Sequence, residues 1–186
     1  MPTAPLQLLT PRLKLRRWQN SDLQPFAQMN ASGQVMRHFP GLLTAQESDA
    51  MVGRMIKGFE EYQLGLWALE LLHSSEFIGF AGLMRPNFEA HFIPCVEVGW
   101  RLSDAFWGKG YATEAARTAM DDGFDRLGLS EIVSMTSVHN VPSMKVMERL
   151  GMTRNPDDDF DHPKIAAGHR LSRHVLYRLR PDQRTW

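Results

Sequence analysis

Two closely spaced glycines, Gly108 and Gly110, lie within the segment Trp107-Gly108-Lys109-Gly110-Tyr111-Ala112-Thr113-Glu114-Ala115. Glycine allows the backbone to approach a ligand closely, and the first N–H groups of a helix have no partner inside the helix. Because this segment runs directly into a stretch with a helical pattern, its amides would lie at the positive end of a helix. We therefore expect residues 107–113 to cradle a phosphate group, with Lys109 adding a salt-dependent contact.

Two familiar nucleotide-binding turns do not match this segment. A P-loop has widely spaced glycines followed by Lys and then Ser or Thr, whereas here one residue separates the glycines and Tyr111 follows. A Rossmann turn has a third glycine and normally opens its fold, but Thr113 occupies that position and the turn follows the fourth predicted strand. The remaining interpretation is a pyrophosphate held by backbone amides.

The elements that would position this turn follow from hydrophobic periodicity and from end signals. Thr44 and Glu47 fit a capping box, and Gly128 and Gly151 are typical of helix C-termini. The pattern predicts helices at 23–29, 45–62, 110–127 and 142–150, and strands at 12–18, 66–72, 77–83, 93–102, 132–138 and 173–179. Basic and apolar residues alternate in segment 12–18, which indicates a strand with one solvated, charged face.

The element order is strand, two helices, three strands, helix, strand, helix, strand. A strand such as 132–138 has apolar residues on either side, so helices must cover both faces of the sheet. The order and the length of 186 residues predict one α/β (α+β) domain spanning 1–186.

Composition limits the partners. The chain has 21 Lys and Arg and 21 Asp and Glu, so it has no overall positive field to attract nucleic acid. Cys95 is the only cysteine, no stretch is apolar enough to span a membrane, and the N-terminus lacks a signal-peptide pattern. We expect a cytoplasmic protein with no nucleic-acid or membrane partner. The adjacent acids 157–159 lack a calcium-loop glycine, so we expect no metal site.

Several segments, in this order and spacing, resemble the GCN5-related N-acetyltransferase (GNAT) superfamily, and specifically its ribosomal-protein N-terminal acetyltransferase branch. They are Thr10-Pro11-Arg12-Leu13-Lys14-Leu15-Arg16, Glu97-Val98-Gly99-Trp100-Arg101-Leu102, the turn described above, Asn140-Val141-Pro142-Ser143 and Met147-Glu148-Arg149-Leu150-Gly151-Met152. The resemblance implies a central mixed, mostly antiparallel, twisted sheet whose splayed central strands bind acetyl-CoA.

The same resemblance assigns residues to the donor. It implies that the pyrophosphate meets the amides of Trp107, Gly108, Lys109, Gly110, Tyr111, Ala112 and Thr113. It implies that the pantetheine arm pairs with the backbone of Trp100, Arg101 and Leu102, as an added strand would. Asn140 and Ser143 match positions that contact the donor on its other side.

Two positions depart from the family pattern. Trp107 replaces the usual glutamine or arginine at the head of the turn, which amide binding tolerates. The tyrosine that often serves as general acid falls at Met147, which cannot donate a proton. Protonation of the leaving thiolate is therefore left to Ser143, to water, or to no enzyme group.

Acetyl transfer to an amine requires a neutral nucleophile, and amines are mostly protonated at neutral pH. Glu97 is the first candidate base, since it lies on the strand beside the expected thioester with apolar neighbours that would raise its pKa. A structural ion pair with an arginine explains Glu97 equally well. His162 is the second candidate because imidazole titrates near neutrality, although a loop histidine without a catalytic role is the alternative. His174 alternates with apolar strand residues and is expected to be packed.

The acceptor is less constrained than the donor. The resemblance places the acceptor wall at Phe26, Arg37, His38, Phe39 and a loop at 155–170 containing Phe160, His162, His169 and Arg170. A protein N-terminus would need an open groove, whereas a small amine would suit an enclosed pocket. We predict an acetyl-CoA-dependent N-acetyltransferase acting on one of these; the alternative, raised by Met147, is a non-catalytic acyl-CoA sensor. Trp186, if exposed, would hint at a homodimer.

Overall fold

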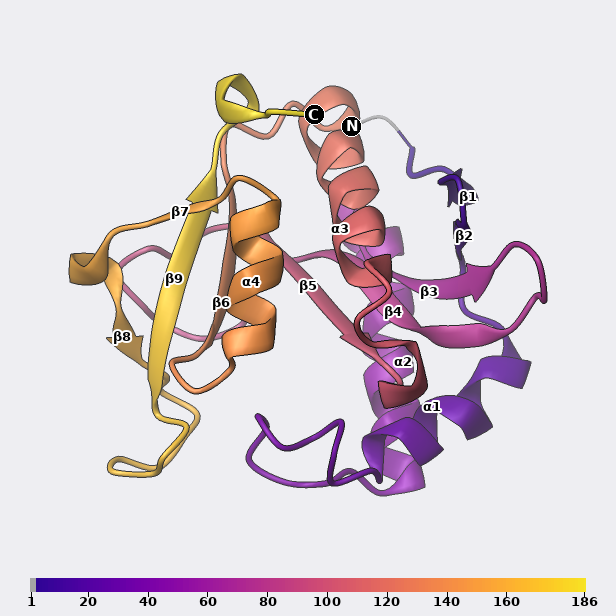
Figure 1. Ribbon diagram of the computed structural model, residues 1–186, viewed down its shortest axis with the longest axis horizontal. Coiled ribbons are helices and arrows are strands. Elements are labelled where there is room, and N and C mark those ends of the chain that lie inside the picture. The colour runs from indigo at the N-terminus through magenta and orange to yellow at the C-terminus, as the bar shows by residue number, and fades with distance from the viewer. Residues whose placement is uncertain (1–2) are drawn as a thin grey trace.

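A nine-stranded sheet forms the centre of the protein (Figure 1). The structure, a computed structural model, describes residues 3–186. The strands are β1 (Gln7–Leu9), β2 (Leu13–Arg16), β3 (Leu66–Leu71), β4 (Phe77–Met84), β5 (Glu97–Leu102), β6 (Ile132–Ser137), β7 (Thr153–Arg154), β8 (Phe160–Asp161) and β9 (Arg173–Leu179). Their order is β1-β2-β3-β4-β5-β6-β9-β7, and β8 also pairs with β9.

In the described part of the chain, β5 and β6 are the only parallel neighbours, and all other neighbouring strands run antiparallel. This confirms the predicted mixed, mostly antiparallel sheet. The predicted strand at 93–102 begins later, at Glu97, because Ile93 donates a backbone hydrogen bond to Ala90 in a turn and Pro94 has no N–H for a ladder. Strands β1, β7 and β8 were not predicted, since two or three residues are too few to show periodicity.

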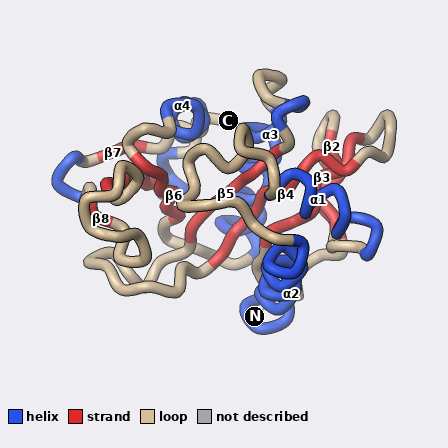
Figure 2. Tube along the Cα trace, turned by 90° about the horizontal axis from the view of Figure 1, so that it is seen from below, coloured by secondary structure: helices blue, strands red, loops and turns tan. Residues whose placement is uncertain are grey.

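Helices lie on both faces of the sheet, as Figure 2 shows for α3 and α4 on one side and α2 on the other. Their bounds are α1 (Leu23–Asn30), α2 (Ala45–Tyr62), α3 (Tyr111–Asp121) and α4 (Val141–Arg149), and a π-helical turn over Asp122–Arg126 extends α3. Short 3-10 turns occupy Asn20–Asp22, Asp104–Phe106, Pro156–Asp158 and Pro181–Gln183. The predicted capping box of α2 is confirmed, because Thr44 accepts from the Glu47 N–H and Glu47 accepts from the Thr44 N–H.

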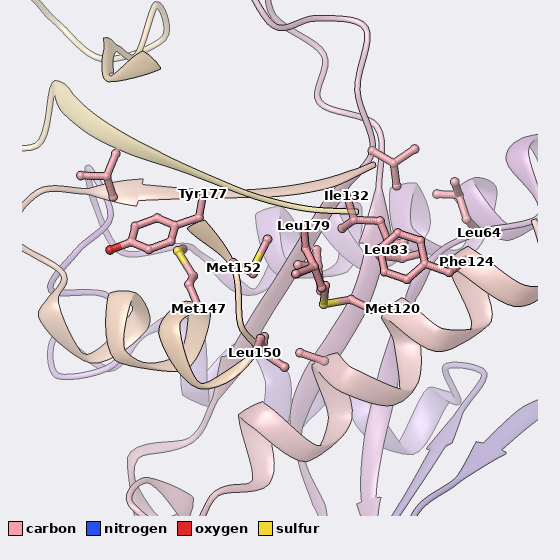
Figure 3. Close-up of a cluster of buried hydrophobic side chains, with 14 residues drawn as sticks. Leu64, Leu83, Met120, Phe124, Ile132, Met147, Leu150, Met152, Tyr177 and Leu179 are labelled. Carbon is pink, nitrogen blue, oxygen red and sulfur yellow. The ribbon is translucent and has the colours of Figure 1, made fainter. Parts of the chain in front are cut away.

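One large core cluster fixes α3 and α4 against the central strands (Figure 3). Met120 and Phe124 from the α3 side and Met147 and Leu150 from α4 pack with strand residues such as Ile132. The helical spacing of these apolar side chains turns them toward the sheet. The N-terminal ends of α3 and α4 are thereby held on the same face, on either side of the β5–β6 junction.

The strand containing Lys14 and Arg16 differs from its prediction. Arg16 is only 7% exposed, and its guanidinium donates to Asp22 and to Glu70. Lys14 also pairs with Glu70 at 2.6 Å. The expected solvated face is found at Arg12 and in part at Lys14, but the expectation is wrong for Arg16, because carboxylates from the first helical turn and from β3 neutralise it inside the protein.

The C-terminal tryptophan is engaged within the chain. The Nε1 of Trp186 donates to Asp121 at 3.0 Å, and the guanidinium of Arg117 lies 4.9 Å from its ring centroid. Trp186 is half-buried, so the exposed aromatic that would have hinted at a homodimer is not found. Within residues 3–186, none of the helices combines the length and the apolar character that crossing a membrane requires.

Candidate active site

The central strands β5 and β6 separate along their length. They pair at Glu97 and Val133, and the Ser134 hydroxyl donates to the Val98 carbonyl at 3.0 Å. No further β5–β6 pairing occurs among the described residues, whereas β5 stays paired with β4 as far as Leu102. Figure 1 shows the two strands diverging from this point. Part of the β5 edge therefore lacks a strand partner, and an extended ligand can pair with it.

Backbone alternation decides which residues face this gap. The carbonyls of Val96 and Val98 accept hydrogen bonds from β6, so the backbone groups of Trp100 and Leu102 point the same way. The Leu102 carbonyl already accepts from the Trp107 indole at 2.8 Å, which leaves its N–H. The backbone of Arg101 points instead toward β4. The prediction that Arg101 backbone contributes to donor binding is therefore wrong.

The glycine turn has the geometry of an anion cradle. Gly108 and Gly110 have φ of 73° and 82°, a left-handed conformation that glycine adopts without strain. The first helical hydrogen bond of α3 runs from the Glu114 N–H to the Gly110 carbonyl. The N–H groups of residues 111–113 therefore have no partner within the helix and are available to an anion.

A clamp from the N-terminal segment holds this turn. Arg12 donates to the Lys109 carbonyl at 2.9 Å and pairs with Glu114, and Thr10 also donates to Glu114 at 2.5 Å. The Arg12 guanidinium lies 4.6 Å from the ring centroid of Tyr111. Sequence reasoning missed the role of Arg12 because its partner Glu114 is 102 positions away and no local pattern links them.

The start of α4 lies on the other side of the gap. Asn140 caps the helix by accepting from the Ser143 N–H at 3.4 Å, and it donates to the Thr136 hydroxyl at 2.9 Å. Asn140 and Ser143 both line a cleft of about 1400 Å³ that also includes the glycine turn and β5. Met147 is 1% exposed and packs in the core, so this position of α4 offers no proton donor.

The two faces of β5 have different surroundings. Val98 and Leu102 pack into the clusters beneath α3, so Glu97, Gly99 and Arg101 point to the opposite face. The cleft reaches that face as well. There it is lined by Glu97, Gly99, Arg101, Met135, His174, His162, Lys164 and the loop residues Arg37, His38 and Phe39. We call this the acceptor side, and we call the glycine turn with the start of α4 the donor side.

Glu97 carries a carboxyl group that has no partner among residues 3–186. Its side chain is partly buried, and it makes no hydrogen bond or salt bridge with the residues at 3–186, so the alternative of a structural ion pair is not found. Burial raises the pKa of Glu97 to about 8. A Cβ placed on Gly99 would meet no atom within 4 Å, which shows that the space beside Glu97 is open.

Two histidines line the acceptor side with ring centroids 5.0 Å apart, and burial lowers the pKa of both. His162 Nδ1 accepts from the Lys164 N–H, so the neutral ring of His162 carries its proton on Nε2. His174 Nδ1 lies 3.0 Å from the Ser172 carbonyl, which only accepts, so His174 keeps its proton on Nδ1 and leaves Nε2 basic. His174 is packed, as expected, but it is better arranged than His162 to accept a proton.

The loop at 37–41 and the loop before β9 meet over the acceptor side. Arg170 donates to the Arg37 carbonyl at 2.7 Å, and Arg37 donates to the His38 ring at 3.1 Å. Arg37 also lies 5.4 Å from the centroid of the Trp107 ring, next to the donor side. The cleft is therefore partly roofed where the two loops touch.

Two predicted acceptor residues do not line the cleft. Phe26 is fully buried, with its ring 5.0 Å from Trp18 and 5.9 Å from Phe80, because it lies on the inner face of α1. Phe160 is 8% exposed and packs against Phe92 at 4.9 Å beneath the histidines. Both rings support the wall from behind, so their assignment as acceptor contacts is wrong.

The acidic run at 157–159 also has a structural role. Asp158 pairs with Arg178, and Asp159 pairs with Arg154. Within the described part of the chain, no group of three or more His, Cys, Asp or Glu side chains is placed to hold a metal ion.

Comparison with known proteins identifies the family. A sequence model described as the acetyltransferase (GNAT) domain matches residues 12–153. The chain belongs to the GNAT acetyltransferase family. It is therefore an acyltransferase, and its family generally uses acetyl-CoA as donor.

Relatives and solved structures agree with the GNAT assignment. The chain is 27% identical over 150 residues to the uncharacterized N-acetyltransferase YnaD of Bacillus subtilis, covering 80% of this chain and 84% of that protein. The crystal structure of an acetyltransferase from Agrobacterium tumefaciens superposes with a TM-score of 0.76 at 26% identity, covering 96% of each chain. A ribosomal-protein-S5-alanine acetyltransferase from Vibrio fischeri shares the fold, with a TM-score of 0.72 at 16% identity over 98% of this chain and 100% of that one.

Proposed function

We propose that this enzyme transfers the acetyl group of acetyl-CoA to a primary amine by direct attack within a ternary complex. One observation carries the proposal: a cleft of about 1400 Å³ joins the amide cradle, the open edge of β5 and the Glu97 carboxyl. A cleft of this size has room for a donor on one side of the gap and an acceptor on the other. Cys95 does not line it, and burial raises the pKa of Cys95 to about 11, which argues against a covalent cysteine intermediate.

The residues on the donor side fit acetyl-CoA. The amides of residues 108–113 and several cations would hold its phosphates, since a polyanion is favoured at a helix N-terminus and near positive charge. The Trp107 N–H does not belong to this set, because it donates to the Asp104 carbonyl at 3.2 Å. The backbone of Trp100 and the Leu102 N–H would pair with the pantetheine arm, and Asn140 and Ser143 would contact it from α4. The cations that line the donor side are Arg12, Lys109, Arg117, Lys145 and Arg149.

The proposed chemistry uses the acceptor side of the gap. When bound, the donor supplies an activated thioester. The amine nitrogen forms a bond to the acetyl carbon as the carbon–sulfur bond breaks, and Glu97 accepts the proton that the amine loses. A pKa of about 8 suits a base that works near neutrality. The leaving thiolate takes a proton from Ser143 or from water, and a backbone N–H in the gap would stabilise the carbonyl oxygen.

An acceptor screen tests the proposal. Thiol release from acetyl-CoA would be followed with a panel of small amines and peptides, and mass spectrometry would locate the acetyl group on the product. We expect release only with a primary amine and an acetylated product. Saturable acetyl-CoA binding without release for any amine would refute the transferase and favour a sensor. We also propose a cytoplasmic location, with which a single unpaired cysteine agrees.

A further inference from the structure

The chain contains two almost fully buried arginines that differ in their partners. Arg16 is 7% exposed and is neutralised by the carboxylates of Asp22 and Glu70. Arg101 is 8% exposed and forms no salt bridge with any residue in 3–186. A buried charge without a counter-charge is costly, and burial lowers the pKa of Arg101 to about 10, which still leaves it protonated at neutral pH. Packing alone does not explain a cation at this position.

The contacts of the Arg101 guanidinium leave one edge free. Its Nη1 donates to Asn30 at 2.7 Å, and its centre lies 4.0 Å from the ring centroid of Phe39 and 5.6 Å from that of Phe80. Its Nε is buried without a hydrogen-bond partner, and Nη2 makes no hydrogen bond to a described residue. The Nε and Nη2 groups form the edge that a carboxylate binds through two parallel hydrogen bonds.

Arg101 lies on the acceptor side of the cleft. Arg101, Gly99 and Glu97 all line the cleft and share one face of β5, and the space beside Gly99 is open. Two strand residues span about 7 Å, so the Cα atoms of Glu97 and Arg101 each lie about that far from Gly99. Arg37 and Lys164 line the same side, where Glu97 is the only acidic residue among those that the structure describes. The acceptor side is therefore positively charged apart from the proposed base.

We propose that Arg101 binds a carboxylate of the acceptor, so that the acceptor is an amine carrying a carboxylate within a few bonds of its amino group. This inference rests on the proposed function and names the substrate class for the same site. The amino group would lie at Glu97 and Gly99, and the carboxylate at the free edge of the guanidinium. The carboxylate can belong to a free amino acid or to an acidic first residue of a peptide. Polyamines, which carry only positive charge, are poor acceptors in this arrangement.

Matched acceptor pairs test the proposal in steady-state thiol-release assays. One arm compares free amino acids with their carboxamides, and the other compares peptides that begin with aspartate or glutamate with peptides that begin with asparagine or glutamine. For the wild-type enzyme we expect kcat/KM to be higher for the carboxylate member of one arm by about tenfold or more, the value of a charge-assisted pair. The arm that shows the preference identifies the source of the carboxylate.

Variants of Arg101 then test whether this residue causes the preference for the carboxylate acceptor. Arg101→Met should bring the ratio within each pair close to one, mainly through KM for the carboxylate acceptor, and Arg101→Lys should restore part of it. Arg85→Gln is the matched control, because Arg85 is exposed, lies 4.7 Å from the Tyr62 ring centroid and does not line the cleft. This control should keep the wild-type ratio.

Three results would overturn the inference. An equal loss for both members of each pair in Arg101→Met would show that Arg101 supports the fold or the reaction instead of recognising a carboxylate. If the wild-type enzyme acetylated amines with and without a carboxylate equally well, the inference would be overturned and the proposed function would still stand. Absence of transfer to every amine would overturn both. If Arg101→Met does not fold, the wild-type preference and Arg101→Lys still decide the question.

Discussion

Replacing Glu97 with glutamine isolates the proposed base with little change in shape. The side chain makes no hydrogen bond or salt bridge with a described residue, so the substitution removes a titratable group without breaking a contact. General-base catalysis contributes about 10²-fold to 10⁴-fold. Because orientation of the amine beside an activated thioester is retained in the variant, we expect kcat to fall by about 10²-fold and not to zero.

The pH profile gives a second readout of the same variant. With a pKa of about 8, about one tenth of the Glu97 carboxyl groups are ionised at pH 7, and the fraction rises about tenfold per pH unit below the pKa. Since the base acts in its ionised form, wild-type kcat should rise with pH and level off above about 8. Glu97→Gln should lose this limb. Glu89→Gln, in an exposed position outside the cleft, is the control and should keep it.

Stability should change in the opposite direction from activity. Burial raises the pKa of Glu97 from 4.5 in its ordinary state to about 8 in the folded protein, so the folded state binds more protons between these values. Wild-type stability should therefore fall as pH rises from about 4.5 to about 8, by at most about 5 kcal/mol. Glu97→Gln removes this loss. The variant should be more stable than the wild type at pH 9 and equally stable near pH 4.

The change in stability is measured by denaturant unfolding at pH 4, 6 and 9. The change in kcat is measured on the same preparations by stopped-flow or steady-state thiol release. A variant that is less stable than the wild type at pH 9 would show that Glu97 has a stabilising partner, and the reasoning from its burial would be wrong. If the Glu97→Gln variant kept the kcat of the wild-type enzyme from pH 6 to pH 9, the proposed role of Glu97 as a base would be refuted.

Three further predictions concern other parts of the protein. Gly110→Ala places a side chain on a left-handed residue at a cost of about 1–2 kcal/mol, so acetyl-CoA affinity measured by calorimetry should fall by about tenfold, and an unchanged Kd would argue against the amide cradle. Asp22→Ala leaves Arg16 buried with one carboxylate, so urea unfolding should show a loss of about 3 kcal/mol with acetyl-CoA affinity unchanged; a loss below about 1 kcal/mol would mean that the site is solvated. His162→Ala should slow turnover without abolishing it, and His174→Gln should slow it more, because only His174 presents an unprotonated Nε2; the reverse order in kcat would contradict the assigned tautomers.

Local sequence signals predicted the glycine turn and the capped start of α4 that the structure shows. The two glycines, the capping residue Asn140 and the hydrophobic periodicity of the flanking elements act over a few residues, so they can be read without knowing the fold. The same signals identified Glu97 on its strand. They did not show whether Glu97 is paired, because an ion pair depends on residues that are distant in sequence.

The acceptor side was harder to predict for the same reason. Phe26 is an aromatic residue of a type that often contacts ligands, but the packing of α1 against β4 buries its side chain completely. His174 was expected to be a packed residue, and its free Nε2 follows only from the carbonyl of Ser172 beside its other nitrogen. The ion pair between Arg12 and Glu114 joins two segments that are distant in sequence and that only the folded sheet brings together.

The sequence by itself determined the glycine turn and the order of the main elements, because these depend on local conformational preferences and on short-range spacing. Only the tertiary structure decided which charged groups are compensated. Arg16 and Arg101 both lie on β-strands and are almost fully buried, yet folding supplies two carboxylates to the first and only an amide and two aromatic rings to the second. That difference is set by long-range packing, and it turns one arginine into a structural residue and leaves the other, which lines the cleft, with a guanidinium edge that has no partner among the described residues.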